Sequence, residues 1–244
     1  MAGHSHYKNM AHRKGIVDAK RGRLWSKLSR AIMVAAKNGG DPAMNVRLRF
    51  AIDQARSVSM PKDNIERAVK KGMGELEGAT FEEMTYEGFG PGGVAVMVDI
   101  LTDNRNRTAG EIRKIFERSG GNMGGPGCVA YLFERKGLFS IPAGAADEDT
   151  LMGIALDAGA DDIEKAGDSF DITCDPTLFA QVKAALEKHN LAPSSAEITQ
   201  VGKVPALCDT ETGQKVLRLL ETLDDHDDVQ NVYSNLNVTD AMMA

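Results

Sequence analysis

The chain has 244 residues, 42% of them hydrophobic, which is an ordinary composition for a globular protein of two or three small domains. Its three cysteines lie far apart with no Cys-x-x-Cys spacing, so they predict neither a disulfide framework nor a zinc site. The longest apolar stretch, 93–101, is much shorter than the ~20 residues of a membrane helix, which argues against a membrane partner. Residues 1–17 lack a secretory apolar core, and we interpret them as part of a mature cytoplasmic protein.

The net charge of −6 is distributed very unevenly along the chain. Residues 1–72, the basic head, hold 16 Lys and Arg against 5 Asp and Glu, a net charge of +11. That leaves 13 against 30, or −17, for residues 73–244, the acidic body. A basic head can bind nucleic-acid phosphates by releasing counterions, while an acidic body repels the same polymer. The alternative is that the head docks on the body of its own chain.

Three helices are predicted in the basic head. Between 18 and 37 the apolar residues Leu24, Leu28 and Ile32 recur at helical spacing, and Trp25 is expected to be partly buried against the bundle. A second helix is centred on 48–55, and a third spans 62–71, with Gly72 as its cap. The cations of the first helix share a separate arc, apart from Arg21, which falls in the apolar arc. We therefore expect a three-helix bundle behind a basic tail.

After Gly74 the pattern changes to strands, with two series of elements. The first series is a strand at 85–88, a strand at 94–101, a helix at 108–119, a glycine-rich turn at 120–127 and a strand at 128–133. The second series has the βαββαβ order of ferredoxin-like domains: strand 138–141, helix 149–158, strands 162–165 and 170–174, helix 176–189 and strand 196–201. A helix at 210–223 and a strand at 229–233 then supply two elements that the first series lacks.

These elements predict an α+β multidomain fold. An N-terminal three-helix bundle is followed by two ferredoxin-like α/β domains, the second inserted into the first. The expected boundaries are 1–77 for the basic tail and helical domain, 78–135 plus 205–244 for the first α/β domain, and 136–204 for the inserted domain. The alternative is two sequential α/β domains with the C-terminal elements packed separately.

Two features of the body are candidate functional loops. Residues 88–93 match G-x-G-x-x-G through Gly88, Gly90 and Gly93, with Gly92 between them, but they lead into a strand rather than a helix. We interpret them as a tight turn between strands instead of a dinucleotide site. The second feature is a dense polar cluster formed by Asp103, Asn104, Arg105, Asn106 and Arg107. It is interpreted either as capping, with Asn106 or Arg107 preceding the helix, or as a ligand-facing loop.

The candidate nucleic-acid-binding residues lie in the tail and on the first helix. They are His4, Lys8, His12, Arg13, Lys14, Lys20, Arg21, Arg23, Lys27 and Arg30. The tail histidines are interpreted as hydrogen-bond donors to phosphate rather than metal ligands, because no Cys or carboxylate stands near them before Asp18. No catalytic carboxylate pair, Ser-His-Asp set or Cys-His pair is recognisable, so we predict no catalytic residue, no metal, no cofactor and no enzyme.

Several segments resemble the YebC/PmpR family, which includes the mitochondrial translational activator of cytochrome oxidase. They are Met-Ala-Gly-His-Ser at 1–5, His-Arg-Lys at 12–14, Asp-Ala-Lys-Arg-Gly at 18–22, Met-Pro-Lys-Asp-Asn-Ile-Glu-Arg-Ala at 60–68, Tyr-Glu-Gly-Phe-Gly-Pro-Gly-Gly at 86–93 and Thr-Asp-Asn-Arg-Asn-Arg-Thr at 102–108. The resemblance implies a three-domain cytoplasmic DNA-binding transcriptional regulator. Other members are similar to translation factors that act on the ribosome at proline-rich stretches. His6-Tyr7 stands where the family usually has Lys-Trp, which weakens a fixed charge of the tail.

Two functions therefore remain open. The first is a non-enzymatic, DNA-binding regulator of transcription. The second is a translation factor that binds ribosomal RNA and assists the synthesis of proline-rich stretches, with the two candidate loops approaching a functional centre. No helix is rich in Asn, Gln and Arg, so backbone contact is predicted rather than strong base readout. A third class, an enzyme or small-ligand sensor, needs a ligand between the α/β domains. The oligomeric state is open, and a monomer is compatible with the sequence.

Overall fold

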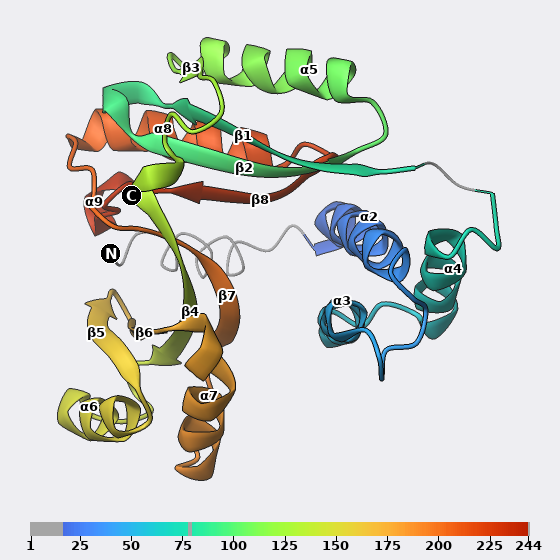
Figure 1. The fold of residues 1–244 in the computed structure, drawn as a ribbon. Helices are drawn as coiled ribbons and strands as arrows, with labels where there is room; N and C mark the ends of the chain where they lie inside the picture. Colours follow the sequence, from blue (N-terminus) through green and yellow to red (C-terminus); the bar gives the residue numbers. More distant parts are fainter. Residues whose placement is uncertain (1–16, 78–79, 244) are drawn as a thin grey trace.

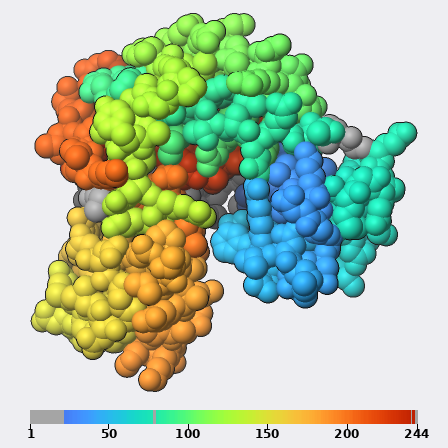
Figure 2. Space-filling view, viewed as in Figure 1, coloured from blue at the N-terminus to red at the C-terminus, as the bar shows by residue number. Residues whose placement is uncertain are grey.

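The computed structural model describes residues 17–77 and 80–243. In these residues the chain forms three N-terminal helices followed by two antiparallel four-stranded sheets with their own helices. Figure 2 shows them as three lobes, with the N-terminal helices in blue and teal, the first sheet mostly in green and red, and the second sheet in yellow and orange. The predicted mixed class with an N-terminal helical part is therefore confirmed. No helix in the described ranges has the length and apolar content needed to cross a membrane.

The three head helices are α2 (Val17–Ala36), α3 (Val46–Ser57) and α4 (Lys62–Gly72). Their core contains Ile32, Leu48 and Ile65, as the apolar spacing predicts. Trp25 is half-buried, as predicted, and its indole N–H donates to the carbonyl of Val58 at 3.3 Å. The prediction that Gly72 caps α4 is wrong. Gly72 lies within the helix, where a Cβ atom would come within 2.3 Å of the Met33 carbonyl oxygen, so the glycine allows α4 to pack closely on α2.

The first sheet contains β1 (Glu82–Phe89), β2 (Ala95–Thr102), β3 (Asn122–Met123) and β8 (Val229–Ser234), in the order β3-β1-β2-β8. Helices α5 (Arg105–Arg118) and α8 (Thr210–Asp224) pack against one face of it (Figure 1). Strand β2 is buried on both faces, because Val96 and Val98 contact the helices while Met97 lies in a second apolar cluster on the opposite face. Burial on both faces explains why β2 is an almost unbroken apolar run.

The second sheet follows the predicted order of elements, strand-helix-strand-strand-helix-strand. These elements are β4 (Phe133–Pro142), α6 (Glu148–Asp157), β5 (Ala160–Ala166), β6 (Ser169–Cys174), α7 (Phe179–Lys188) and β7 (Ser195–Gly202). The strand order is β5-β6-β4-β7, and its core contains Phe139, Ile172 and Leu186. All four strands therefore come from a segment that lies between β3 and β8 of the first sheet. The domain boundaries proposed from the sequence stay a prediction.

The predicted strand at 128–133 is wrong. Residues Ala130–Leu132 form a short 3₁₀ turn, η2, and β4 begins at Phe133. The buried Glu87 carboxylate accepts hydrogen bonds from the backbone N–H groups of Gly127 (2.7 Å), Val129 (2.8 Å) and Ala130 (2.8 Å), so these donors are not available to a neighbouring strand. The edge of the first sheet is formed instead by β3, which pairs with β1 from inside the glycine-rich turn.

The C-terminal part of the body contains one element that the sequence did not predict. The short helix α9 (Asp240–Met243) follows β8, and its Met242 side chain is buried. A Cβ atom at Gly213 of α8 would come within 2.4 Å of the Met242 sulfur. The absence of a side chain at Gly213 therefore lets α9 pack directly on α8.

Candidate nucleic-acid interface

Only part of the predicted binding set lies in the described part of the chain. His4, Lys8, His12, Arg13 and Lys14 are outside the described residues. Lys20 and Arg21 belong to α2, but the description does not extend to their side chains. The remaining three, Arg23, Lys27 and Arg30, recur at spacings of four and three residues, which places them on one face of α2.

This face of α2 contacts the segment Asp224–Asp228, which runs from the last residue of α8 to the start of β8 and is here called the acidic turn. Arg23 pairs with Asp225 at 2.9 Å, Lys27 with Asp224 at 3.1 Å, and Arg30 with Asp228 at 3.3 Å. The first two pairs are solvent-accessible on at least one side, whereas Asp228 is only 4% exposed. The head is thus held on the body of its own chain, which is the contact that the docking alternative predicts.

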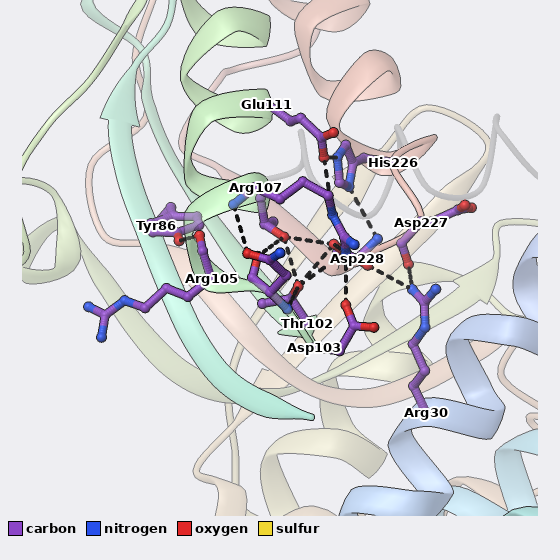
Figure 3. A network of polar contacts seen from close by, with 12 residues as sticks. Arg30, Tyr86, Thr102, Asp103, Arg105, Arg107, Glu111, His226, Asp227 and Asp228 are labelled. Carbon is purple, nitrogen blue, oxygen red and sulfur yellow. Dashed lines mark hydrogen bonds and ion pairs between the residues drawn. The ribbon is translucent and has the colours of Figure 1, made fainter. Parts of the chain in front are cut away.

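Asp228 is the centre of the polar network in Figure 3. Its Oδ2 atom accepts hydrogen bonds from Thr108 (2.7 Å), Arg107 (2.8 Å) and Thr102 (3.1 Å). Burial by itself raises the pKa of the Asp228 carboxyl, but these three donors outweigh it, and the pKa is lowered from its ordinary value. Asp228 is therefore a buried, ionised carboxylate that ties β2, α5 and α2 to the acidic turn.

His226 strengthens the same turn. Its Nδ1 atom accepts from the backbone N–H of Asp228 at 3.1 Å, which leaves Nε2 as the protonated nitrogen in the neutral ring. Nε2 lies 3.0 Å from the Glu111 carboxylate of α5. The imidazole is therefore oriented on both sides, and it connects the acidic turn to α5.

The polar cluster at 103–107 begins α5. The predicted helix start at residue 108 is three residues late, and the cap is Asn104 rather than Asn106 or Arg107. The Asn104 side-chain oxygen accepts from the Arg107 N–H at 3.1 Å, and the Arg107 guanidinium bonds Asp103 at 3.0 Å as well as Asp228. The contacts of Asn104 and Arg107 thus explain both residues by structural roles, the capping of α5 and the binding of Asp103 and Asp228. In the described residues, the exposed side chains of Arg105 and Asn106 have no hydrogen-bond or ion-pair partner.

The glycine loop at 88–93 is a tight turn between two antiparallel strands, as predicted, and does not lead into a helix of the dinucleotide-binding type. Gly92 (φ 69°) and Gly93 (φ 75°) adopt left-handed backbone conformations that favour glycine. At Gly88 a Cβ atom would come within 2.5 Å of the Asn122 carbonyl oxygen, so glycine allows β3 to pair there. A ligand role for this loop stays a prediction.

The three cysteines are free thiols, and burial raises the pKa of each, that of Cys174 to about 11. None of them is therefore activated as a thiolate at neutral pH. Within residues 17–77 and 80–243, no group of three or more His, Cys, Asp or Glu side chains is arranged to hold a metal ion.

The acidic turn was not predicted from the sequence as the partner of α2. The available signal was four carboxylates within five residues, Asp-Asp-His-Asp-Asp, directly after a predicted helix. Its contact with α2 joins residues 197 positions apart, so no local pattern indicates it.

The fold and this contact define a three-lobed α/β protein whose basic first helix is ion-paired to an acidic turn. Residues 5–75 match the family domain described as the TACO1/YebC protein N-terminal domain, and residues 81–236 match the TACO1/YebC second and third domain. The chain therefore belongs to the TACO1/YebC family, which confirms the resemblance.

Individual relatives match over nearly their whole length. A probable transcriptional regulatory protein of Rhodopirellula baltica is 54% identical over 239 residues, 97% of each chain. Another from Natranaerobius thermophilus is 50% identical, covering 100% of this chain and 99% of the relative. The crystal structure of a conserved hypothetical protein from Aquifex aeolicus, 48% identical, is similar with a TM-score of 0.80 over 91% of this chain and 93% of that one.

Proposed function

We propose that this protein is a non-enzymatic, cytoplasmic regulator of gene expression that binds the phosphate backbone of nucleic acid, as a DNA-binding transcriptional regulator, through its basic tail and α2. The observation that carries the proposal is the presence of Arg23 and Lys27 on one face of α2, each bonded to an exposed carboxylate, whereas Arg30 of the same face is bound to the buried Asp228. Phosphate and carboxylate oxygens are recognised by the same guanidinium and ammonium donors. The names of the relatives, which call them probable transcriptional regulatory proteins, support the same function.

In this proposal the acidic turn and the nucleic acid compete for α2. Exposed ion pairs such as Arg23–Asp225 contribute only about 0–1 kcal/mol each, whereas a nucleic acid also gains free energy by releasing counterions. Phosphates therefore replace the carboxylates of Asp224 and Asp225. Arg30 stays on Asp228, because a buried carboxylate that loses its cation costs several kcal/mol.

A comparison of four proteins distinguishes phosphate binding by Arg23 and Lys27 from docking of the head on the acidic turn. They are the wild type, Arg23→Gln/Lys27→Gln, Asp224→Asn/Asp225→Asn, and the variant with all four substitutions. The double Asn variant removes the carboxylates that these cations contact in the folded chain. If Arg23 and Lys27 contact phosphate, removing them in this background still weakens nucleic-acid binding and reduces the salt slope by about 1.4–1.8. Equal affinity and slope with and without the two cations in this background would show that they serve docking alone.

The second candidate function is that of a translation factor on ribosomal RNA. This candidate is supported by the composition of α2, which contains no Asn or Gln. Because these are the side chains that recognise adenine, α2 favours contact with the nucleic-acid backbone over base readout. In a purified translation system this candidate predicts a higher yield of a reporter with a proline run, relative to a matched alanine run, when the protein is added. Equal effects on both reporters would reject it.

A further inference from the structure

Helix α5 is a positively charged helix within the acidic body. It carries five of the 13 Lys and Arg of residues 73–244: Arg105, Arg107, Arg113, Lys114 and Arg118. Against them stand only Glu111 and Glu117, so the helix has a net charge of +3 in a segment whose net charge is −17. Apart from the candidate loop at 103–107, the functions discussed above do not use this concentration of charge.

Most of this charge is exposed and unpaired. The helix packs on the first sheet through Thr108, Ile112 and Phe116, and it lies along the outer side of that sheet (Figure 1). Arg107 is bound to Asp103 and Asp228. The other four cations are exposed, and none of them makes an ion pair with any residue in 17–77 or 80–243.

Two features of this placement are unfavourable for the helix itself, although Arg118 in the last turn is favoured by the helix dipole. Arg105 lies in the first turn, where the helix dipole favours acidic residues and where α5 has none. Lys114 and Arg118 are like charges four residues apart, a spacing that destabilises a helix. Within the described residues no carboxylate pairs with Arg105, Arg113, Lys114 or Arg118, and an external anion would supply the missing partner.

We propose that the outward face of α5 is a second contact surface for the phosphate backbone of nucleic acid, in addition to α2. This inference rests on the proposed function. With 14 residues, α5 is about 21 Å long, which matches roughly six phosphates of one strand of a duplex. Arg107 of α5 and Arg30 of α2 bind the two oxygens of the same Asp228 carboxylate, at 2.8 and 3.3 Å.

The shared carboxylate brings the two basic helices close together at the acidic turn (Figure 3). An anion that contacts Arg113, Lys114 and Arg118 of α5 and also the exposed cations of α2 must be long and regularly charged. These are properties of a nucleic-acid strand, and they favour it over a short acidic peptide.

The test neutralises three exposed cations of α5 in the full chain, as Arg113→Gln/Lys114→Gln/Arg118→Gln. Glutamine keeps the helix propensity and much of the side-chain length. The matched control removes three exposed cations from the second sheet and its helix, as Lys165→Gln/Lys183→Gln/Lys188→Gln. Binding of a labelled single-stranded RNA and a duplex DNA, each longer than α5, is titrated over a range of salt, and thermal unfolding checks that both variants fold.

The expected result is a Kd raised by about 3- to 100-fold and a salt slope smaller by about 2–3 for the α5 variant, with much smaller changes for the control. If the α5 variant matches the control while removal of Arg23 and Lys27 still weakens binding, the α5 surface is rejected and the proposed function stands. If the wild type binds neither nucleic acid, both are rejected. If the α5 variant keeps nucleic-acid binding but loses binding of poly-L-glutamate, the surface recognises acidic protein and the proposal is overturned.

Discussion

Neutralising the acidic turn should increase the affinity of α2 for nucleic acid. In Asp224→Asn/Asp225→Asn, Arg23 and Lys27 lose their carboxylate partners, while Lys27 keeps its contact with the backbone carbonyl of residue 224. The side chains of Asp224 and Asp225 are 59% and 57% exposed, so each pair contributes about 0.2–1 kcal/mol. Nucleic acid then no longer has to displace about 0.4–2 kcal/mol of ion pairing, which corresponds to a Kd lower by about 2- to 30-fold.

The assay is fluorescence anisotropy with a labelled RNA and a labelled duplex DNA at one fixed salt concentration. The control is Asp149→Asn/Asp157→Asn, which removes two exposed carboxylates from α6 and changes the net charge by the same amount as the acidic-turn variant. A gain in affinity for the acidic-turn variant well beyond that of the control supports competition. Equal gains would mean that only net charge matters, and weaker binding of the acidic-turn variant would mean that the docked head is the binding form.

Three further predictions concern stability. Asp228→Asn leaves Arg30 and Arg107 without a buried carboxylate and should lower the free energy of unfolding in urea by about 2–4 kcal/mol. Because the pKa of Asp228 is lowered in the folded state, this stabilisation is present above the ordinary Asp pKa of about 4 and is lost as pH falls further. The difference in unfolding free energy between wild type and Asp228→Asn should therefore shrink in acid. A difference that does not change with pH would contradict the assignment of Asp228 as an ionised carboxylate. Glu87→Gln should cost about 2–3 kcal/mol, because an amide offers one acceptor oxygen to three backbone donors; an unchanged urea midpoint would show that another group takes those donors. Asn104→Ala should cost about 1 kcal/mol by removing the cap of α5, and a melting temperature equal to that of wild type would argue against the cap.

Most elements of the fold could be predicted because their signals are local. The spacing of Leu28 and Ile32 indicates α2, and the apolar run around Val96 indicates a strand buried on both faces. The strand predicted at 128–133 failed for a non-local reason. Its residues have strand-like composition, but their backbone donors are bound by Glu87, which lies about 40 positions away in the sequence. Strand β3 has only two residues and lies inside a glycine-rich turn, so no periodicity could reveal it.

Of the candidate site, the cations on α2 could be predicted from the sequence, but their partner residues could not. Helical spacing places Arg23, Lys27 and Arg30 on one face of α2, which is a property of the sequence alone. Their partner residues depend on how the first sheet brings β2, α5 and β8 together. The same is true of the ion pair between Arg107 and Asp228. Complementary charge made docking one of the alternatives, but the identity of the partner residues required the tertiary structure.

The proposed function requires that this protein binds nucleic acid in the cell through its basic head. Crosslinking in living cells, followed by recovery of the protein and sequencing of the attached nucleic acid, tests it most directly. We expect more nucleic acid attached to the protein than in an uncrosslinked control, and less of it for Arg23→Gln/Lys27→Gln in the Asp224→Asn/Asp225→Asn background. Recovery of promoter DNA or of ribosomal RNA distinguishes the two candidate functions. Recovery no higher than in the uncrosslinked control, from cells that contain the folded protein, would contradict the claim.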